Sequence, residues 1–146
     1  MKKTLLIFLS FMCFFTNAQE KNSDTLKVAV KTKFGELTFT KYCRNDKLEF
    51  VQSGKPIFDE KVENDAKERK ITEDKLKMKF TINSSGKLES CEIVIPSKLK
   101  SLDTFLLEMF NDAILKLNAE DYSLSCNGKR KSYVMPIVYK AQKKQK

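Results

Sequence analysis

The residues of this 146-residue chain that are candidates for chemistry include its cysteines and carboxylates, and the chain contains no histidine. Without histidine, a Cys-His or Ser-His nucleophile is excluded, and the commonest metal ligand is missing. The chain also lacks a CxxC pair, a glycine-rich phosphate loop and an HExxH helix. Neighbouring carboxylates such as Glu73 and Asp74 carry nothing that marks a catalytic pair. We therefore expect no enzyme activity, no metal site and no cofactor.

Three of the four cysteines lie beyond residue 18 of the chain. An odd number of cysteines in an oxidising compartment allows one internal disulfide and leaves one free thiol. Cys91 has the same strand parity as Ile93 and Ile95, so we interpret it as a core residue. Cys43 and Cys126 are then the pair to test, although the sequence alone does not fix the pairing.

Residues 1–18 have the three parts of a secretory signal peptide. Two lysines precede an apolar run at residues 4–15, and Thr16, Asn17 and Ala18 form a cleavage site of small residues. The alternative, a transmembrane anchor, needs about 20 apolar residues, which is longer than this run. We expect cleavage after Ala18 and a mature protein that is periplasmic or secreted, with no transmembrane anchor.

The chain is basic, with 28 Lys and Arg residues against 19 Asp and Glu residues. Removing the two lysines of the predicted signal leaves 26 basic residues and a net charge of +7. An exported basic protein meets anionic cell wall, lipid headgroups or acidic protein surfaces rather than nucleic acid. The lysines and arginines concentrate at residues 129–131 and 140–146, where a solvated surface and a solvated tail are sufficient explanations.

Residues 19–58 are predicted to form a β-rich segment, and a short surface helix is expected after it. Apolar residues alternate with polar ones in three runs, and Leu37, Phe39 and Tyr42 are expected to face the same way. The expected strands are residues 25–32, 37–42 and 47–52. Within residues 59–70, Val62 and Ala66 are one helical turn apart, which predicts a helix with a thin apolar stripe.

Residues 76–139 contain the strongest pattern in the chain. Two runs with a period of two, residues 76–82 and 87–95, predict a hairpin that turns at Gly86. Apolar residues at three- and four-residue spacing then predict a helix over residues 102–117, with Ser101 as its N-cap. The last apolar run contains Pro136, which cannot donate to a sheet ladder and therefore favours an edge strand.

These elements predict an α+β protein with a ββαβ core. The core would be a small antiparallel sheet packed by one amphipathic helix, and the β meander and short helix would precede it. The predicted organisation is a signal peptide at residues 1–18, the β-rich segment at 19–58, and a domain with a basic tail at 59–146.

Residues 76–140 resemble the C-terminal domain of TonB-type energy transducers. The resemblance is carried by Phe80, Gly86 and Ser97 in and after the hairpin. It extends to Leu102-Asp103 at the helix start, Asn127-Gly128-Lys129 and Met135-Pro136-Ile137. The chain departs from the family at Val62-Glu63, where the family has Tyr-Pro, and at residues 115–118, where it has Trp and Pro.

The resemblance implies a protein-binding module in the periplasm of a Gram-negative bacterium. TonB domains bind a segment of an outer-membrane receptor, which adds a strand beside the last strand of the domain. Here the partner would be such a receptor or another envelope protein, and the edge would consist of Ser132, Tyr133, Val134, Met135, Ile137, Val138 and Tyr139. The alternatives are that this strand only completes the sheet, or that exposed edges pair in a homodimer.

Energy transduction is not carried over from the family. A transducer needs an uncleaved membrane helix and a long proline-rich spacer, whereas this chain has three prolines and a predicted cleaved signal. The alternative function is an exported basic protein that binds anionic cell-wall or membrane material, with steep salt dependence. A small hydrolase is disfavoured because no histidine and no nucleophile motif are present.

Overall fold

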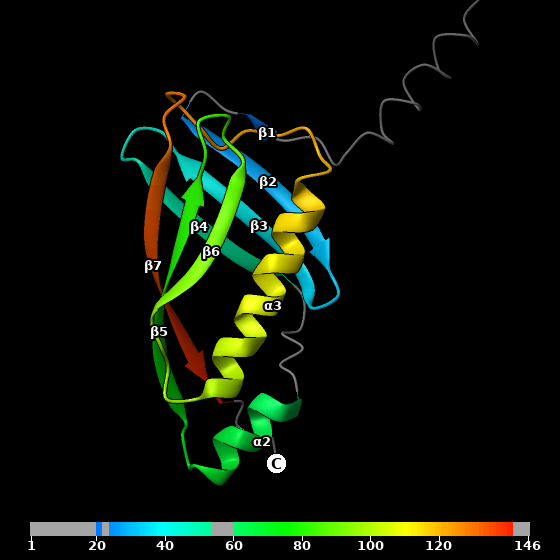
Figure 1. Cartoon of the computed structure of the whole chain (residues 1–146), viewed down its shortest axis with the longest axis vertical. Coiled ribbons are helices and arrows are strands. Elements are labelled where there is room, and N and C mark those ends of the chain that lie inside the picture. Colours follow the sequence, from blue (N-terminus) through cyan, green and yellow to red (C-terminus); the bar gives the residue numbers. More distant parts are fainter. Residues whose placement is uncertain (1–19, 22–23, 54–59, 142–146) are drawn as a thin grey trace, which may run out of the picture.

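The computed structural model describes residues 20–21, 24–53 and 60–141 (Figure 1). The predicted signal peptide with its cleavage site, and residues 142–146 of the basic tail, lie outside this range. Within it, no helix is both long enough and apolar enough to cross a membrane.

The protein is α+β, as predicted, with two antiparallel sheets and two helices in the described residues (Figure 1). One sheet has the order β1-β2-β3-β4 and the other has the order β6-β5-β7. The elements are β1 (Glu20–Lys21), β2 (Thr25–Thr32), β3 (Gly35–Tyr42), β4 (Lys47–Ser53), α2 (Glu60–Glu68), β5 (Glu73–Ile82), β6 (Leu88–Ile95), α3 (Lys100–Leu117) and β7 (Lys131–Lys140).

The β6-β5-β7 sheet confirms the predicted ββαβ order. Leu76, Met78, Phe80 and Ile82 of β5 are buried on its inner face, as their period of two requires. Antiparallel β7 pairs with β5 over all ten of its residues and has no partner strand on its other side among the described residues. The predicted edge position is therefore confirmed.

Helix α3 buries the apolar stripe that its spacing predicts, but it begins two residues earlier than expected, at Lys100. The buried residues are Leu102, Phe105, Leu106, Met109, Phe110, Ala113, Ile114 and Leu117. The prediction of Ser101 as N-cap is wrong, because Leu99 occupies that position and makes no side-chain cap. The buried Asp74 carboxylate accepts hydrogen bonds from the N–H groups of Lys98 (2.9 Å) and Leu99 (3.1 Å). A negative group from β5 thus satisfies the start of the helix.

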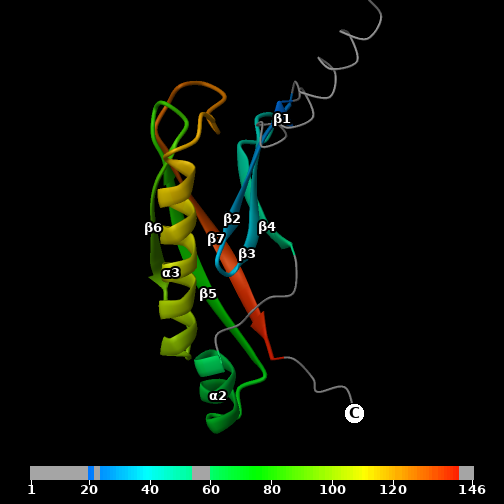
Figure 2. The ribbon, with the colours of Figure 1, turned by 90° about the vertical axis from the view of Figure 1, so that its right-hand side faces the viewer.

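The N-terminal meander and the ββαβ unit share one hydrophobic core. Helix α3 contacts β6 in one sheet and β2 in the other (Figures 1 and 2). Four rings from four elements meet at the centre, with Phe80 and Phe110 centroids 4.9 Å apart and Phe50 and Phe110 centroids 5.0 Å apart. Phe39 contacts all three of these rings. The meander is therefore the second wall of the core.

Two features of the core depart from the sequence analysis. On β3, the residue that shares the inner face with Leu37 and Phe39 is Lys41, not Tyr42, and Lys41 is only 3% exposed. In the loop before β7, Tyr122 and Leu124 are buried although the surrounding sequence is polar. The Tyr122 hydroxyl accepts a hydrogen bond from the Leu88 N–H at 2.8 Å, which connects this loop to β6.

Candidate functional site

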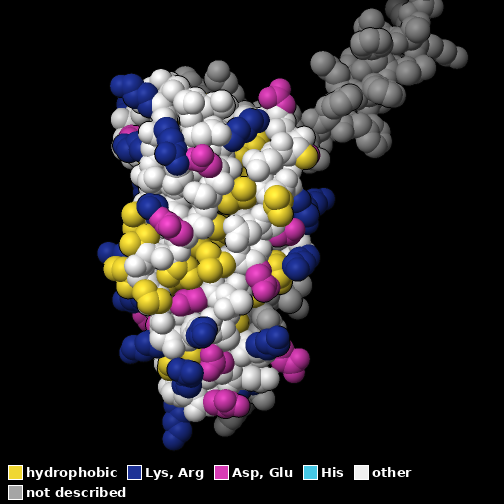
Figure 3. Space-filling model, in the orientation of Figure 1, with side chains coloured by type: hydrophobic (Ala, Val, Ile, Leu, Met, Phe, Trp, Pro, Cys, Tyr) yellow, Lys and Arg dark blue, Asp and Glu magenta, His cyan; other side chains and the backbone are white. Residues whose placement is uncertain are grey.

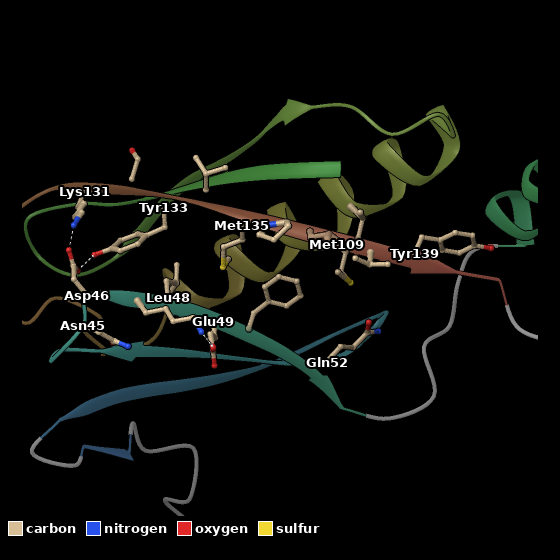
Figure 4. A pocket seen from close by; sticks show the side chains of 18 of the residues that line it. Asn45, Asp46, Leu48, Glu49, Gln52, Met109, Lys131, Tyr133, Met135 and Tyr139 are labelled. Carbon is tan, nitrogen blue, oxygen red and sulfur yellow. Dashed lines mark hydrogen bonds and ion pairs between the residues drawn. The ribbon is translucent and has the colours of Figure 1, made fainter. Parts of the chain in front are cut away.

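The edges of β4 and β7 border a cleft of about 900 Å³ (Figure 4). The two strands belong to different sheets, and in the described residues each pairs with only one neighbour, β4 with β3 and β7 with β5. Clefts that bind ligands commonly have volumes of about 300–1,000 Å³. The volume of this cleft is therefore sufficient for a short peptide segment.

The interior of the cleft is mostly apolar. Helix α3 forms its floor, and side chains from the two strands form its walls. The apolar lining residues include Leu48 and Phe50 from β4, Met135, Ile137 and Tyr139 from β7, and Leu102, Leu106 and Met109 from α3. An occupant with apolar side chains would thus replace water against the floor, which stabilises binding by roughly 25 cal/mol per Å² buried.

Exposed valines border the cleft on the solvent side. They are Val134 and Val138 of β7, which are 54% and 49% exposed. On the neighbouring face, which is the side of β6 and α3, Figure 3 shows apolar side chains gathered midway along the molecule, with charged side chains above and below them. An extended segment between the two strands would contact α3 with alternate side chains and these valines with the others.

The open edge of β7 offers backbone groups at alternating residues. Pro136 has no N–H, and proline in a sheet is found where its nitrogen faces away from the neighbouring strand. In an antiparallel strand the N–H and C=O of every second residue point to the same side. The N–H groups of Val134 and Val138 should therefore face the cleft, while those of Met135 and Ile137 pair with β5.

One end of the cleft is closed by contacts to Asp46, which lies in the turn between β3 and β4 (Figure 4). The Tyr133 hydroxyl donates to Asp46 Oδ1 at 2.7 Å, and the ammonium groups of Lys41 and Lys131 both form ion pairs with the same carboxylate. Asp46 has φ 53°, a left-handed conformation that Asp tolerates better than most residues. Burial lowers the pKa of the Lys41 ammonium and raises the pKa of the Tyr133 phenol.

A disulfide lies beside the Asp46 contacts. Cys43, directly after β3, is bonded to Cys126 in the loop before β7, with a Cα–Cα distance of 5.7 Å. Cys91 is a free, half-buried thiol on β6, and burial raises its pKa to about 11. Because the thiolate is the reactive form, this shift lowers the reactivity of Cys91 at neutral pH.

At the other end of the cleft the strands diverge (Figure 4). Gln52 and Tyr139 border this open end. The Gln52 amide donates to the Phe34 carbonyl at 2.9 Å, which is a bond within the N-terminal sheet. Burial raises the pKa of Tyr139, and the negative charge of Glu63 raises it further.

The carboxylates noted in the sequence have structural roles. Asp74 is 6% exposed and accepts three backbone hydrogen bonds, from Lys75, Lys98 and Leu99. In the part of the chain that the structure describes, no group of three or more His, Cys, Asp or Glu residues could hold a metal ion.

All seven residues predicted for partner binding lie on β7 and line the cleft: Ser132, Tyr133, Val134, Met135, Ile137, Val138 and Tyr139. The sequence did not predict that β4 forms the opposite wall, because the pattern at residues 47–52 indicates a short strand but not its position in the fold. It also missed Asp46, which no motif marks. Met109 and its neighbours were expected in the core, and they also form the floor of the cleft.

Searches against protein-family models, curated proteins and solved structures found no match to this chain. The function of the cleft must therefore be argued from its own residues and from the sequence resemblance of residues 76–140.

Proposed function

We propose that this protein is a non-enzymatic binding module that takes up an extended segment of another envelope protein by strand addition at β7. The observation that carries the proposal is the open edge of β7, which faces the edge of β4 across an apolar floor. Unpaired backbone groups on such an edge give affinity, and alternating side-chain contacts give specificity.

Two features of the sequence support an envelope protein as the partner. The signal-like residues 1–18 favour export, and the resemblance of residues 76–140 to TonB C-terminal domains favours a receptor or another envelope protein as the source of the segment. Energy transduction is not part of this proposal.

Binding to anionic cell-wall or membrane material is less well supported. The outer face of β5 carries a row of lysines, Lys75, Lys77 and Lys79. Two of them are paired with acids, Lys75 with Glu73 at 3.8 Å and Lys79 with Glu92. These pairs lower the net charge of the face, so it is a weak site for polyanions.

An NMR titration of residues 19–146 tests strand addition. The probes are peptides of six to ten residues from outer-membrane receptors and other envelope proteins, including TonB-box-like sequences. We expect the largest amide shifts at Val134 and Val138, with affinity that changes little between low and physiological salt. Diffuse shifts on lysines that disappear with added salt would instead support the anionic-surface alternative.

Two substitutions at one residue separate the backbone from the side chain. Val138→Pro removes a backbone donor, and Pro136 already shows that β7 tolerates proline at this parity. Losing one hydrogen bond of about 1 kcal/mol should weaken binding about fivefold. The control Val138→Thr keeps the N–H and should bind nearly as well as the wild type. Equal loss in both variants would contradict strand addition.

A further inference from the structure

We infer that the cleft binds the free C-terminal segment of another protein, which runs antiparallel to both β4 and β7 and places its carboxylate at the end closed by Asp46. This inference rests on the proposed strand addition at β7. It adds the polarity of the bound segment, the position of its end and the chemical group that the closed end recognises.

The polarity follows from the directions of the two strands. Strand β4 begins at Lys47, next to Asp46, and β7 begins at Lys131, which pairs with Asp46. Both strands therefore run from the closed end to the open end (Figure 4). A segment that runs the opposite way would form two antiparallel ladders, which are slightly more stable per residue than parallel ones.

Insertion in this direction would join the two sheets into one. The order would become β1-β2-β3-β4, the bound segment, and then β7-β5-β6. Every pair of neighbours in that sheet would be antiparallel, as all existing pairs already are. The bound segment would also remove two exposed edges at once, which a strand added on one side only cannot do.

The closed end explains why the segment should terminate there. Tyr133 and Lys131 at the start of β7 both contact Asp46 in the turn before β4, so these side chains cross the path between the strands. The Cys43–Cys126 disulfide supports the same end. A chain that enters at the open end with the inferred polarity arrives with its carboxyl end first. A free C-terminus fits this blind end.

The charge at the closed end fits a carboxylate. The single carboxylate of Asp46 faces two ammonium groups, those of Lys41 and Lys131. Behind this contact lies a smaller hollow of about 330 Å³, which is also lined by Lys129 and Arg130. Glu89 neutralises Arg130 at 2.9 Å. The other three cations face only the carboxylate of Asp46, so the net charge of the cluster is positive. Charge-assisted hydrogen bonds to a carboxylate are about twice as strong as neutral ones.

The sequence of this chain argues against its own tail as the occupant. Residues 142–146 are Gln, Lys, Lys, Gln and Lys, with no apolar side chain to contact the floor. Their lysines would also approach the ammonium groups of Lys41 and Lys131. The segment should instead carry apolar residues at alternate positions, to pack on Met109 and its neighbours, and it should come from another protein.

The test uses N-acetylated hexapeptides with Val, Ile, Leu or Phe at alternate positions and Ser, Thr or Gln between them. Each peptide is made with a free carboxylate and with a carboxamide, and its Kd is measured on residues 19–146 by calorimetry. We expect the free acids to bind at least tenfold more tightly than the amides. Equal affinity of the two forms, or no binding of either, would overturn the inference.

Two matched lysines at opposite ends of β7 test the polarity. Lys131→Met should reduce the preference for the free acid to less than threefold, whereas Lys140→Met should leave it unchanged. The reverse result would show that the segment runs the other way. Lys131 is 53% exposed, so its loss should not unfold the protein, and Lys131→Gln provides a second variant at the same site.

Receptor peptides that shift the amide signals of Val134 and Val138 without any dependence on a free carboxylate would overturn this inference and leave the proposed function intact.

Discussion

The two ends of the cleft between β4 and β7 are built in opposite ways. At the closed end, a disulfide, the Lys131–Asp46 ion pair and a tyrosine hydroxyl connect the N-terminal sheet to β7 and the loop before it. At the open end, Gln52 and Tyr139 border diverging strands whose edges are unpaired in the described residues. Both ends lie over the same helix, α3, so the difference arises from the contacts between the strands.

The difference indicates how a small protein can keep two strand edges available. If both ends were free, the sheets could shift relative to each other and the cleft would have no defined width. If contacts between the strands closed both ends of the cleft, no segment could enter. Fixing one end orders the edges before binding, which lowers the entropy that a partner must overcome. The comparison can be tested by loosening the closed end step by step.

The largest effect is expected from removing the disulfide. Replacing Cys43 and Cys126 together by Ser releases a link between residues 83 positions apart. The chain-entropy relation gives a loss of about 4.5 kcal/mol in the free energy of unfolding, measured by urea denaturation. The control Cys91→Ala should change it by less than about 1 kcal/mol. A loss below about 1 kcal/mol in the double variant would show that the non-covalent contacts alone hold the closed end.

The second largest loss of stability is expected from a substitution at Gly86, in the hairpin that packs against the loop carrying Cys126. Gly86 has φ +82°, and a Cβ there would lie 1.9 Å from Ser123 Oγ and 2.9 Å from the Leu124 nitrogen. Gly86→Ala should lower the free energy of unfolding by about 2–3 kcal/mol, from steric overlap together with a disfavoured φ. At Gly128 (φ +69°) the nearest atom would be 4.0 Å away, so Gly128→Ala should cost only about 1 kcal/mol. Similar losses in thermal denaturation of the two variants would be inconsistent with this packing.

Removing the charge of Asp46 should have an intermediate effect. Asp46→Asn keeps tolerance of the left-handed backbone but leaves the Lys41 ammonium, whose side chain is 4% exposed, without a counter-charge. We expect a loss of about 1–2 kcal/mol at pH 7, and a much smaller loss for the control Glu49→Gln, which breaks an exposed pair.

The Asp46→Asn loss should also depend on pH. Burial lowers the pKa of Lys41, so below its unfolded pKa of 10.5 the unfolded chain binds more protons than the folded protein. Stability from this group therefore rises as the pH increases toward 10.5, and the penalty of Asp46→Asn should shrink. A penalty that stays constant from pH 7 to 10 would show that Lys41 is not the affected group.

The smallest effect concerns Cys91, which lies away from both ends. Its folded pKa of about 11 exceeds the unfolded value of 9.0, so the stability that it contributes is complete below pH 9 and is lost as the pH rises through 11. Allowing for partial exposure, the loss is about 1 kcal/mol, obtained by comparing the pH dependence of unfolding in wild type and Cys91→Ala. We also expect a thiol reagent to label Cys91 slowly in the folded protein at pH 7.5. Fast labelling of the folded protein would show that the thiol is not shielded by burial.

The sequence by itself determined the elements whose patterns are local. The period of two in β5, the stripe of α3 and the turn glycine Gly86 each follow from burying one face of one element or from the φ of one residue. Pro136 likewise predicted an edge strand, because a missing N–H is a property of that residue alone.

Only the tertiary structure decided what lies across the cleft. Asp46 meets Tyr133 across 87 positions of sequence, Asp74 satisfies the start of α3 from another element, and Lys41 occupies an inner-face position that hydrophobicity assigns to an apolar residue. These contacts join side chains from separate elements, and no periodicity within either element encodes them. The resemblance of residues 76–140 drew attention to β7, but the second wall of the cleft arises from the packing of β4 and α3 against one core. That packing depends on the whole chain.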